Sequence, residues 1–243
     1  MCRMLAYSSD GPRDLAPYLA HLARLSVHGK LEDRWEKRPG GNHPDGWGIA
    51  FRRDGETFLF RSGNPASTDP YLAGFQGVTD CFLGHARYAD NTETVDAGNA
   101  HPFLLQGIAL AHNGTFRGRI GEEADRRLVC DSLVFLEVLA GHWKDRTHSG
   151  LCETLSHLLG DTELVGAYSA ATMLIASGRT IFALRNYRKD EDYYTLFVRV
   201  QPDLVVVASQ PLDDSPGWRL MENGELLDLC LPAPKSLFLT ATT

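Results

Sequence analysis

The sequence predicts a layered α+β fold built on antiparallel sheets, and two observations lead to this prediction. First, strand-like runs follow one another across short turns, such as Asp54 with Gly55 and Ser177 with Gly178, which are typical of β-hairpins. Second, the helical patterns are grouped between blocks of strands. Helices that alternate with strands would indicate a doubly wound parallel sheet, so that fold class is not expected.

The amino-terminal part predicts a buried strand and then a helix. The apolar run at residues 1–7 is expected to form a strand that opens directly at the terminus. Leucines recur at helical spacing through residues 14–28, and Asp14 is a suitable N-cap for that helix. The polar residues 30–44 are expected to form a long loop.

The middle of the chain predicts strands followed by two helices. The strands expected here are residues 48–53, 57–61, 81–87 and 107–112. Apolar residues at helical spacing predict a helix over residues 128–139 that ends at Gly141. A second helix is expected over residues 151–159, stopped by Gly160.

The carboxyl-terminal part predicts closely spaced strands and offers packing signals without chemistry. The expected strands are residues 170–176, 180–184, 194–200 and 204–209. A last hairpin is expected to turn at Asn223 and Gly224, because Asn-Gly favours the tight turns of hairpins.

Composition narrows the function classes. The chain has 243 residues, of which 43% are hydrophobic and 23% charged, with a net charge of −7. This balance is that of an ordinary globular protein, and the length suits one large domain over residues 1–243. The acidic excess argues against a nucleic-acid or anionic-membrane partner. No run of about 18 apolar residues and no signal peptide is recognised, so we expect a cytoplasmic protein.

The five cysteines predict neither a disulfide framework nor a zinc site. Their number is odd and no C-x-x-C pair occurs. Four of them are expected to be small buried apolar side chains: Cys81, Cys130, Cys152 and Cys230. The histidines show no metal-ligand spacing, so no metal is expected.

Cys2 carries the first chemical signal. Removal of Met1 would leave Cys2 as the first residue, so that its thiol lies beside a free α-amine. Such an amine has a pKa near 7.7–8.0, so it can take the thiol proton and later protonate a leaving amine. A cysteine also occurs at this position by chance in many proteins.

Further candidate residues each have a structural and a chemical interpretation. Asn113 and Gly114 follow a predicted strand and form either a hairpin turn or the donors of an oxyanion hole. Arg87 is either a surface residue or a fork for a substrate carboxylate. Asp131, inside an apolar helix pattern, either faces solvent, caps a neighbour or pairs with a substrate ammonium. His101 is either structural or part of the site.

The order of these motifs is more specific than any one of them. Cys2 is followed in turn by the motifs DGWG (45–48), GHARY (84–88), NAHPF (99–103) and HNG (112–114), and by Asp131. This set resembles the glutaminase domain of the class II, N-terminal-nucleophile glutamine amidotransferases. It is most similar to their small stand-alone members, which include the γ-glutamyl hydrolase of ergothioneine biosynthesis. The resemblance implies a four-layer αββα sandwich, in which two antiparallel sheets lie between helical layers.

The resemblance also implies a role for each matching residue. It makes Cys2 the nucleophile and Asn113 with Gly114 the oxyanion donors. It makes Arg87 the partner of the substrate α-carboxylate and Asp131 the partner of its α-ammonium. His101 would position Arg87 or the substrate. Larger family members often have Arg-Trp-Ala-Thr-His where this chain has RYADN (87–91), so Tyr88 would offer its backbone to the substrate.

The expected activity is cleavage of the γ-glutamyl amide of glutamine or a related compound through a Cys2 thioester, without metal or organic cofactor. Two versions stay open. The ammonia could pass to a synthase partner, or the chain could hydrolyse another γ-glutamyl amide alone. A non-catalytic binding or regulatory module that kept the fold is the alternative from another class. An acylase is less expected, because a simple acyl group needs no pair of opposite charges.

Overall fold

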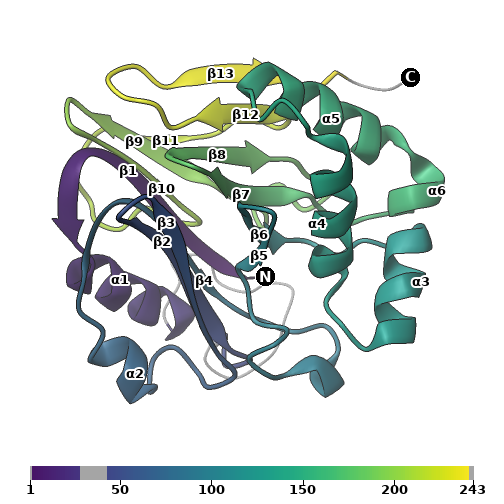
Figure 1. The fold of residues 1–243 in the computed structure, drawn as a ribbon, viewed down its shortest axis with the longest axis horizontal. Coiled ribbons are helices and arrows are strands. Elements are labelled where there is room, and N and C mark those ends of the chain that lie inside the picture. The colour runs from purple at the N-terminus through teal and green to yellow at the C-terminus, as the bar shows by residue number, and fades with distance from the viewer. Residues whose placement is uncertain (1, 28–42, 241–243) are drawn as a thin grey trace.

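The computed structural model describes residues 2–27 and 43–240, and there two antiparallel sheets lie face to face with helices on both outer sides (Figure 1). Met1 and most of the loop expected at residues 30–44 lie outside the described residues. The α+β sandwich expected from the sequence is confirmed.

The first sheet has seven strands among the described residues, in the order β11-β9-β10-β1-β4-β2-β3. All of its neighbouring strands pair antiparallel. Its strands are β1 (Arg3–Asp14), β2 (Trp47–Arg53), β3 (Glu56–Ser62), β4 (Val78–Ala86), β9 (Phe197–Gln201), β10 (Leu204–Ala208) and β11 (Trp218–Leu220). The strand β1 is therefore interior to the sheet, paired with β10 on one side and β4 on the other.

The second sheet has six described strands, in the order β13-β12-β8-β7-β6-β5. These strands are also antiparallel. They are β5 (Phe103–Leu105), β6 (Ile108–Asn113), β7 (Thr172–Ser177), β8 (Thr180–Arg185), β12 (Glu225–Asp228) and β13 (Lys235–Phe238).

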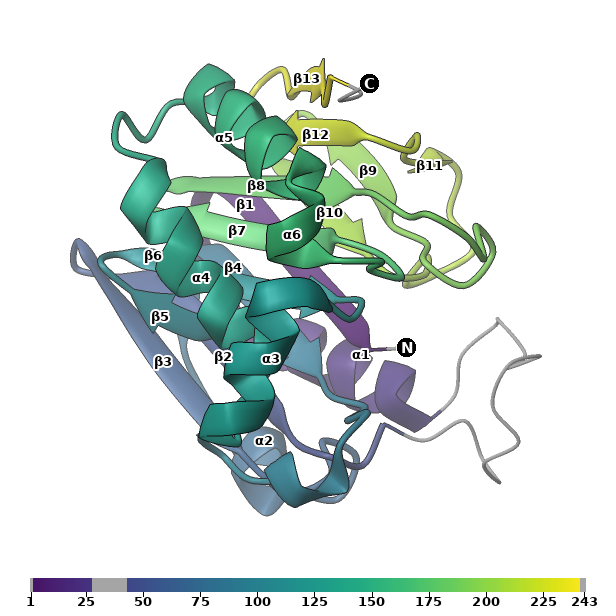
Figure 2. The same ribbon diagram turned by 90° about the vertical axis from the view of Figure 1, so that its right-hand side faces the viewer.

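Helices cover the outer face of each sheet, which makes four layers (Figure 2). The helices α1 (Ala16–Val27) and α2 (Pro70–Ala73) pack on the first sheet. The second sheet is covered by α3 (Gly118–Arg127), α4 (Asp131–His142), α5 (His148–Gly160) and α6 (Thr162–Val165). No described helix is long and apolar enough to cross a membrane.

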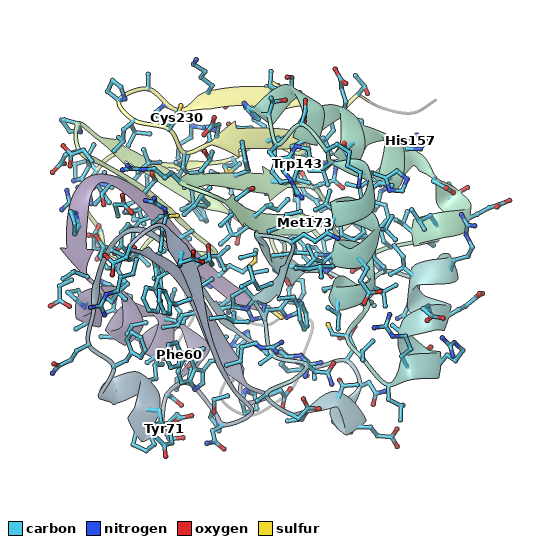
Figure 3. All side chains as sticks on the ribbon, in the orientation of Figure 1. Phe60, Tyr71, Trp143, His157, Met173 and Cys230 are labelled. Carbon is cyan, nitrogen blue, oxygen red and sulfur yellow. The ribbon has the colours of Figure 1, made fainter. Side chains whose placement is uncertain are left out.

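Three apolar clusters hold these layers together. Two of them explain why the sequence at the start of β1 is a continuous apolar run. Met4 and Ala6 face the second sheet, whereas Leu5 and Tyr7 belong to the cluster beneath α1. Because side chains alternate along a strand, a strand buried on both faces needs apolar residues at every position. The third cluster joins the second sheet to its helices and includes Trp143 and Met173, which Figure 3 labels on that side of the molecule.

Several element boundaries differ from the sequence prediction. The strand β1 continues to Asp14, with a register shift between Ser8 and Arg13, because Arg13 and Asp14 still pair with β4. Asp14 is therefore not the helix N-cap, although its carboxylate accepts from the N–H of Ala16 at 3.0 Å. The strand β9 begins at Phe197 and not at residue 194. The short elements α2, β5, α6 and β11 were not predicted.

The helix expected over residues 128–139 is shifted. Residues 118–127 form α3, whose sequence contains few apolar residues. Leu128 ends that helix in the left-handed conformation with φ of 53°, so α4 cannot begin before Asp131. Gly141 lies inside α4 and does not terminate it.

The last predicted hairpin is also wrong. Asn223 and Gly224 connect β11, in the first sheet, to β12, in the second. The final hairpin is instead formed by β12 and β13. An Asn-Gly turn fixes a local reversal but does not decide which sheet each flanking strand joins.

Candidate active site

Cys2 lies directly before β1 and is buried between the two sheets. Its main-chain nitrogen donates to Asn113 Oδ1 at 3.1 Å. Its thiol lies 3.7 Å from the carbonyl oxygen of Tyr88, which accepts from it. Burial raises the pKa of the thiol, and the nearby Arg87 guanidinium acts in the opposite direction. Cys2 is thus hydrogen-bonded at both its main-chain nitrogen and its sulfur.

Asn113 is the last residue of β6 and Gly114 follows it, so both come to Cys2 from the second sheet. The structure contains no hairpin here, because the chain passes from Gly114 toward α3. With Oδ1 taken by Cys2, the buried Nδ2 of Asn113 has no hydrogen-bond partner among the described residues. Gly114 has φ of 151°, and a Cβ there would lie 1.9 Å from the carbonyl oxygen of Ala170. Only glycine fits this turn.

Two cavities meet at Cys2. The first, of about 310 Å³, is lined by Arg87, His101 and Asp131. The second, of about 380 Å³, is lined by Asn113 and by residues of the segment between β8 and β9. Both cavities include Cys2 and Gly114 in their walls. A molecule bound across the two would therefore pass directly over the Cys2 thiol.

Arg87 is buried, which excludes the interpretation of a surface arginine. Its guanidinium donates to the carbonyl oxygen of Thr94 at 2.5 Å and to Thr94 Oγ1 at 2.7 Å. A guanidinium has five N–H donors, so two of them are engaged with Thr94. The DGWG motif supports the backbone beside it, because Asp45 accepts from the Ala89 N–H at 2.8 Å and Gly46 accepts from the Arg87 N–H at 2.8 Å.

Asp131 is the first residue of α4 and not an interior helix position as expected. One carboxylate oxygen accepts from the Phe116 N–H at 2.6 Å, and the other accepts from the Ser132 N–H at 2.8 Å. The helix N-terminus also favours its negative charge. Asp131 therefore caps its neighbours and at the same time lines the first cavity, so its structural and chemical interpretations do not exclude each other.

His101 lines the first cavity. The hydrogen bonds described above for the Arg87 guanidinium go to Thr94 and not to His101. Its Nε2 lies 3.9 Å from the Cys130 sulfur, and its ring lies 4.4 Å from the ring of His85. Burial lowers the pKa of His101 well below its usual value, and lowers that of His85 to about 3. Burial also lowers the pKa of His112, whose Nδ1 lies 2.8 Å from Ser132 Oγ. Of these three buried histidines, His101 and His112 line the first cavity.

Tyr88 contributes its backbone to the site, because its carbonyl oxygen accepts from Cys2. Tyr88 also lines both cavities. Within the described part of the chain, no group of three or more His, Cys, Asp or Glu side chains is arranged to hold a metal ion.

Three supporting residues were not recognised from the sequence. Thr94 holds the guanidinium of Arg87, and Asn99 accepts from the Cys130 N–H at 2.8 Å just before α4. Cys130 itself lines the first cavity and is only half-buried, contrary to expectation, as is Cys230. Asn99 and Asp45 lie in the recognised motifs NAHPF and DGWG. Their supporting roles could not be predicted, because each accepts a hydrogen bond from a residue that is distant in sequence, Cys130 for Asn99 and Ala89 for Asp45.

Comparisons with known proteins identify the family of this sequence. The family model described as glutamine amidotransferases class-II matches residues 1–231. The chain is 26% identical over 233 residues to the gamma-glutamyl-hercynylcysteine sulfoxide hydrolase of Mycolicibacterium smegmatis, covering 94% of this chain and 96% of that protein. It is 28% identical over 225 residues to the uncharacterized protein MJ1515 of Methanocaldococcus jannaschii, covering 76% of this chain and 61%, less than two thirds, of that protein.

Solved structures share the fold. A glutamine aminotransferase class-II domain protein from Silicibacter pomeroyi superposes with a TM-score of 0.67 at 18% identity, covering 99% of this chain and 100% of that chain. The glutamine phosphoribosylpyrophosphate amidotransferase of B. subtilis superposes with a TM-score of 0.65 at 18% identity. That match covers 99% of this chain but 50% of the amidotransferase.

Proposed function

This chain belongs to the class-II glutamine amidotransferases, and from that premise we propose that it hydrolyses γ-glutamyl amides with Cys2 as nucleophile. We propose residues 1–243 as one glutaminase domain. The observation that carries the proposal is the buried, unpartnered Nδ2 of Asn113, an amide whose Oδ1 accepts from the main-chain nitrogen of Cys2. An unsatisfied buried donor is costly to keep, and a developing oxyanion would satisfy it.

In the proposed mechanism the amino-acid head of the substrate binds in the first cavity. The Arg87 guanidinium pairs with its α-carboxylate through donors that Thr94 does not use. The Asp131 carboxylate pairs with the α-ammonium through Oδ2, which among the described residues accepts only from the Phe116 N–H. Its Oδ1, by contrast, accepts from Ser132 and Cys130. His101 and the Tyr88 backbone complete the wall of this cavity.

The chemical step uses the amino group of Cys2, which becomes free when Met1 is removed. This amine takes the thiol proton, and the thiolate attacks the side-chain carbonyl carbon of the substrate. The contact of the Cys2 nitrogen with Asn113 Oδ1 supports this arrangement, because it holds the base close to the thiol. Nδ2 of Asn113 and the backbone of Gly114 stabilise the negative oxygen that forms.

Collapse of this intermediate breaks the C–N bond. The nitrogen leaves with the proton held by the Cys2 amine, and a γ-glutamyl thioester remains on Cys2. Water then attacks the thioester, which releases glutamate and restores the thiol. Apart from the attacking water, every group that these steps use belongs to the chain or to the γ-glutamyl substrate.

The alternative of a non-catalytic module is less well supported. A module without chemistry would have no need of an unpartnered buried donor on the side chain that contacts Cys2. The match with the Mycolicibacterium gamma-glutamyl-hercynylcysteine sulfoxide hydrolase, which covers nearly all of both chains, supports hydrolysis of a γ-glutamyl compound. Transfer of ammonia to a synthase partner stays a prediction, which copurification of such a partner would support.

The test is release of glutamate from γ-glutamyl substrates by the purified protein, after mass spectrometry has shown that Met1 is absent. Cys2→Ala should abolish release, and Cys230→Ala, which removes a thiol far from the site, should retain it. An affinity label such as 6-diazo-5-oxo-L-norleucine should alkylate Cys2 alone with loss of N₂, which adds the mass of the label less that of N₂. Full activity in Cys2→Ala would refute the assignment of the nucleophile.

A further inference from the structure

The second cavity at Cys2 is not needed for the amino-acid head of the substrate. It lies on the Asn113 side of Cys2, away from Arg87 and Asp131, neither of which lines it. Its volume of about 380 Å³ is that of a small-molecule site and far exceeds the space that ammonia requires. If the γ-carbonyl of the substrate lies over Cys2, this cavity receives what is bonded to the amide nitrogen.

The outer wall of this cavity is fixed by hydrogen bonds. It comes from the segment that joins β8 to β9, which carries Lys189, Asp190, Tyr193 and Tyr194 into the lining. The buried guanidinium of Arg185 holds that segment through the carbonyl oxygens of Glu191 at 2.8 Å and Tyr194 at 2.9 Å. The same guanidinium donates to the carbonyl oxygen of Met221 at 2.7 Å.

The lining of the cavity combines aromatic rings with charges of both signs. Tyr168 and Tyr194 are buried, and Tyr193 packs edge-to-face on Tyr194 with 5.0 Å between ring centroids. At the rim, Lys189 and Arg117 contribute cations. Asp90, whose carboxylate accepts from the Thr115 hydroxyl, lies beside Cys2 and lines both cavities.

We propose that the second cavity is a leaving-group subsite, and that the substrates of this chain are γ-glutamyl amino acids in preference to glutamine. This inference rests on the proposed function. The tyrosine rings would pack against the side chain of the leaving amino acid. Lys189 and Arg117 would pair with its carboxylate. Asp90 would favour the ammonium that forms on the departing nitrogen.

The bond changes are those of the proposed hydrolysis, except that the amide nitrogen carries the rest of the leaving amino acid. The amide C–N bond breaks as the Cys2 thioester forms, and the nitrogen takes the proton from the Cys2 amine. At neutral pH the released amino acid binds a further proton from water and leaves as a zwitterion. Its ammonium and carboxylate then match the charges of both signs in the cavity lining.

The experiment compares three substrates that share the γ-glutamyl head. L-γ-Glutamyl-L-tyrosine carries both the ring and the carboxylate, L-γ-glutamyl-tyramine carries the ring alone, and L-glutamine carries neither. We expect kcat/KM to fall in that order, with each step roughly three- to tenfold. Glutamine cleaved as well as the dipeptide would overturn the subsite while leaving the proposed function intact. Equal rates for the dipeptide and the tyramine derivative would overturn carboxylate recognition.

Two variants test the same assignment within the protein. Lys189→Gln should lower kcat/KM for γ-glutamyl-tyrosine roughly threefold to tenfold and leave that for glutamine unchanged. Tyr193→Ala should lower kcat/KM for both tyrosine-derived substrates. Lys235→Gln, on β13, is the matched charge control. Equal losses on all three substrates would contradict a leaving-group role. If no substrate is cleaved and Cys2 is not labelled, the proposed function itself fails.

Discussion

The main-chain nitrogen of Cys2 and the side-chain amide of Asn113 are joined by a 3.1 Å hydrogen bond across 111 positions of sequence. This bond connects the two sheets, because Cys2 precedes β1 and Asn113 ends β6. It also orients the amide, since an oxygen that accepts from Cys2 leaves the amide nitrogen as an unpartnered donor within the described part of the chain. One contact therefore positions the proposed base and the proposed oxyanion donor together.

Asn113→Ala tests the oxyanion assignment. Loss of one preorganised donor should lower kcat by roughly 10²–10³ with little change in KM, because the interaction forms mainly in the transition state. Steady-state kinetics on a γ-glutamyl substrate measures this. The exposed Asn64→Ala serves as control. A variant that raised KM alone would show instead that Asn113 binds the ground state.

Asp131→Asn tests the ammonium partner. Loss of the charge should cost about 2–5 kcal/mol in kcat/KM for substrates that carry an α-ammonium. Glutaric acid monoamide has the same amide but no α-amine, so the variant and the unaltered protein should cleave it at similar rates. Because Asp131 also caps α4, thermal unfolding of both proteins should be compared. Equal losses on the two substrates would refute the pairing.

Thr94→Val tests whether Thr94 positions Arg87. The substitution keeps the carbonyl acceptor but removes the hydroxyl that accepts from the guanidinium at 2.7 Å. KM should rise several-fold while kcat stays close to its original value, as for a loss of uniform binding. Thr94→Ser should restore the original KM. Failure of serine to restore it would point to packing of the Thr94 methyl group.

The buried imidazoles predict that stability decreases in acid. Burial lowers the pKa values of His85, His101 and His112, so the folded protein binds fewer protons than the unfolded chain below pH 6.5. Each such histidine lowers the free energy of unfolding by up to about 1.4 kcal/mol per pH unit as the pH falls. For His85 the loss continues down to its folded pKa of about 3.

Urea denaturation at pH 7.5, 6.0 and 5.0 measures this dependence. His85→Gln should give a shallower decrease than the unaltered protein, because it removes one titrating group. A free energy of unfolding that did not change over this range would contradict the assignment of neutral buried histidines.

Much of the fold followed from local pattern, and the failures have physical causes. The strands around Asp54 and Ser177 were predicted because hairpin turns and apolar alternation are properties of neighbouring residues. The segment of α3 was missed because it buries only Ile120 and Ala124. The start of α4 was predicted wrongly because Leu128 adopts a left-handed conformation that leucine disfavours, so the local sequence gives no signal for that turn.

In the candidate site, too, some residues could be predicted from sequence motifs and others could not. The order of motifs identified Cys2, Arg87 and Asn113, which the structure brings to the same pair of cavities. It did not identify Thr94 or Tyr194, because a threonine hydroxyl that accepts from a guanidinium and a tyrosine in a cavity wall have no local signature. Whether an arginine is exposed or buried depends on the whole fold, which is why the surface interpretation of Arg87 was possible.

The interior position of β1 has a consequence for the opening motions of the protein. Cys2 is joined directly to a strand that is paired on both sides and packed on both faces. Its amides should exchange with solvent deuterium only through rare global openings, while those of exposed β3 residues exchange through small local ones. The proposed catalytic terminus thus belongs to the slowest-exchanging unit, and hydrogen exchange at Leu5 and Ala6 should report the same free energy as loss of activity in denaturant.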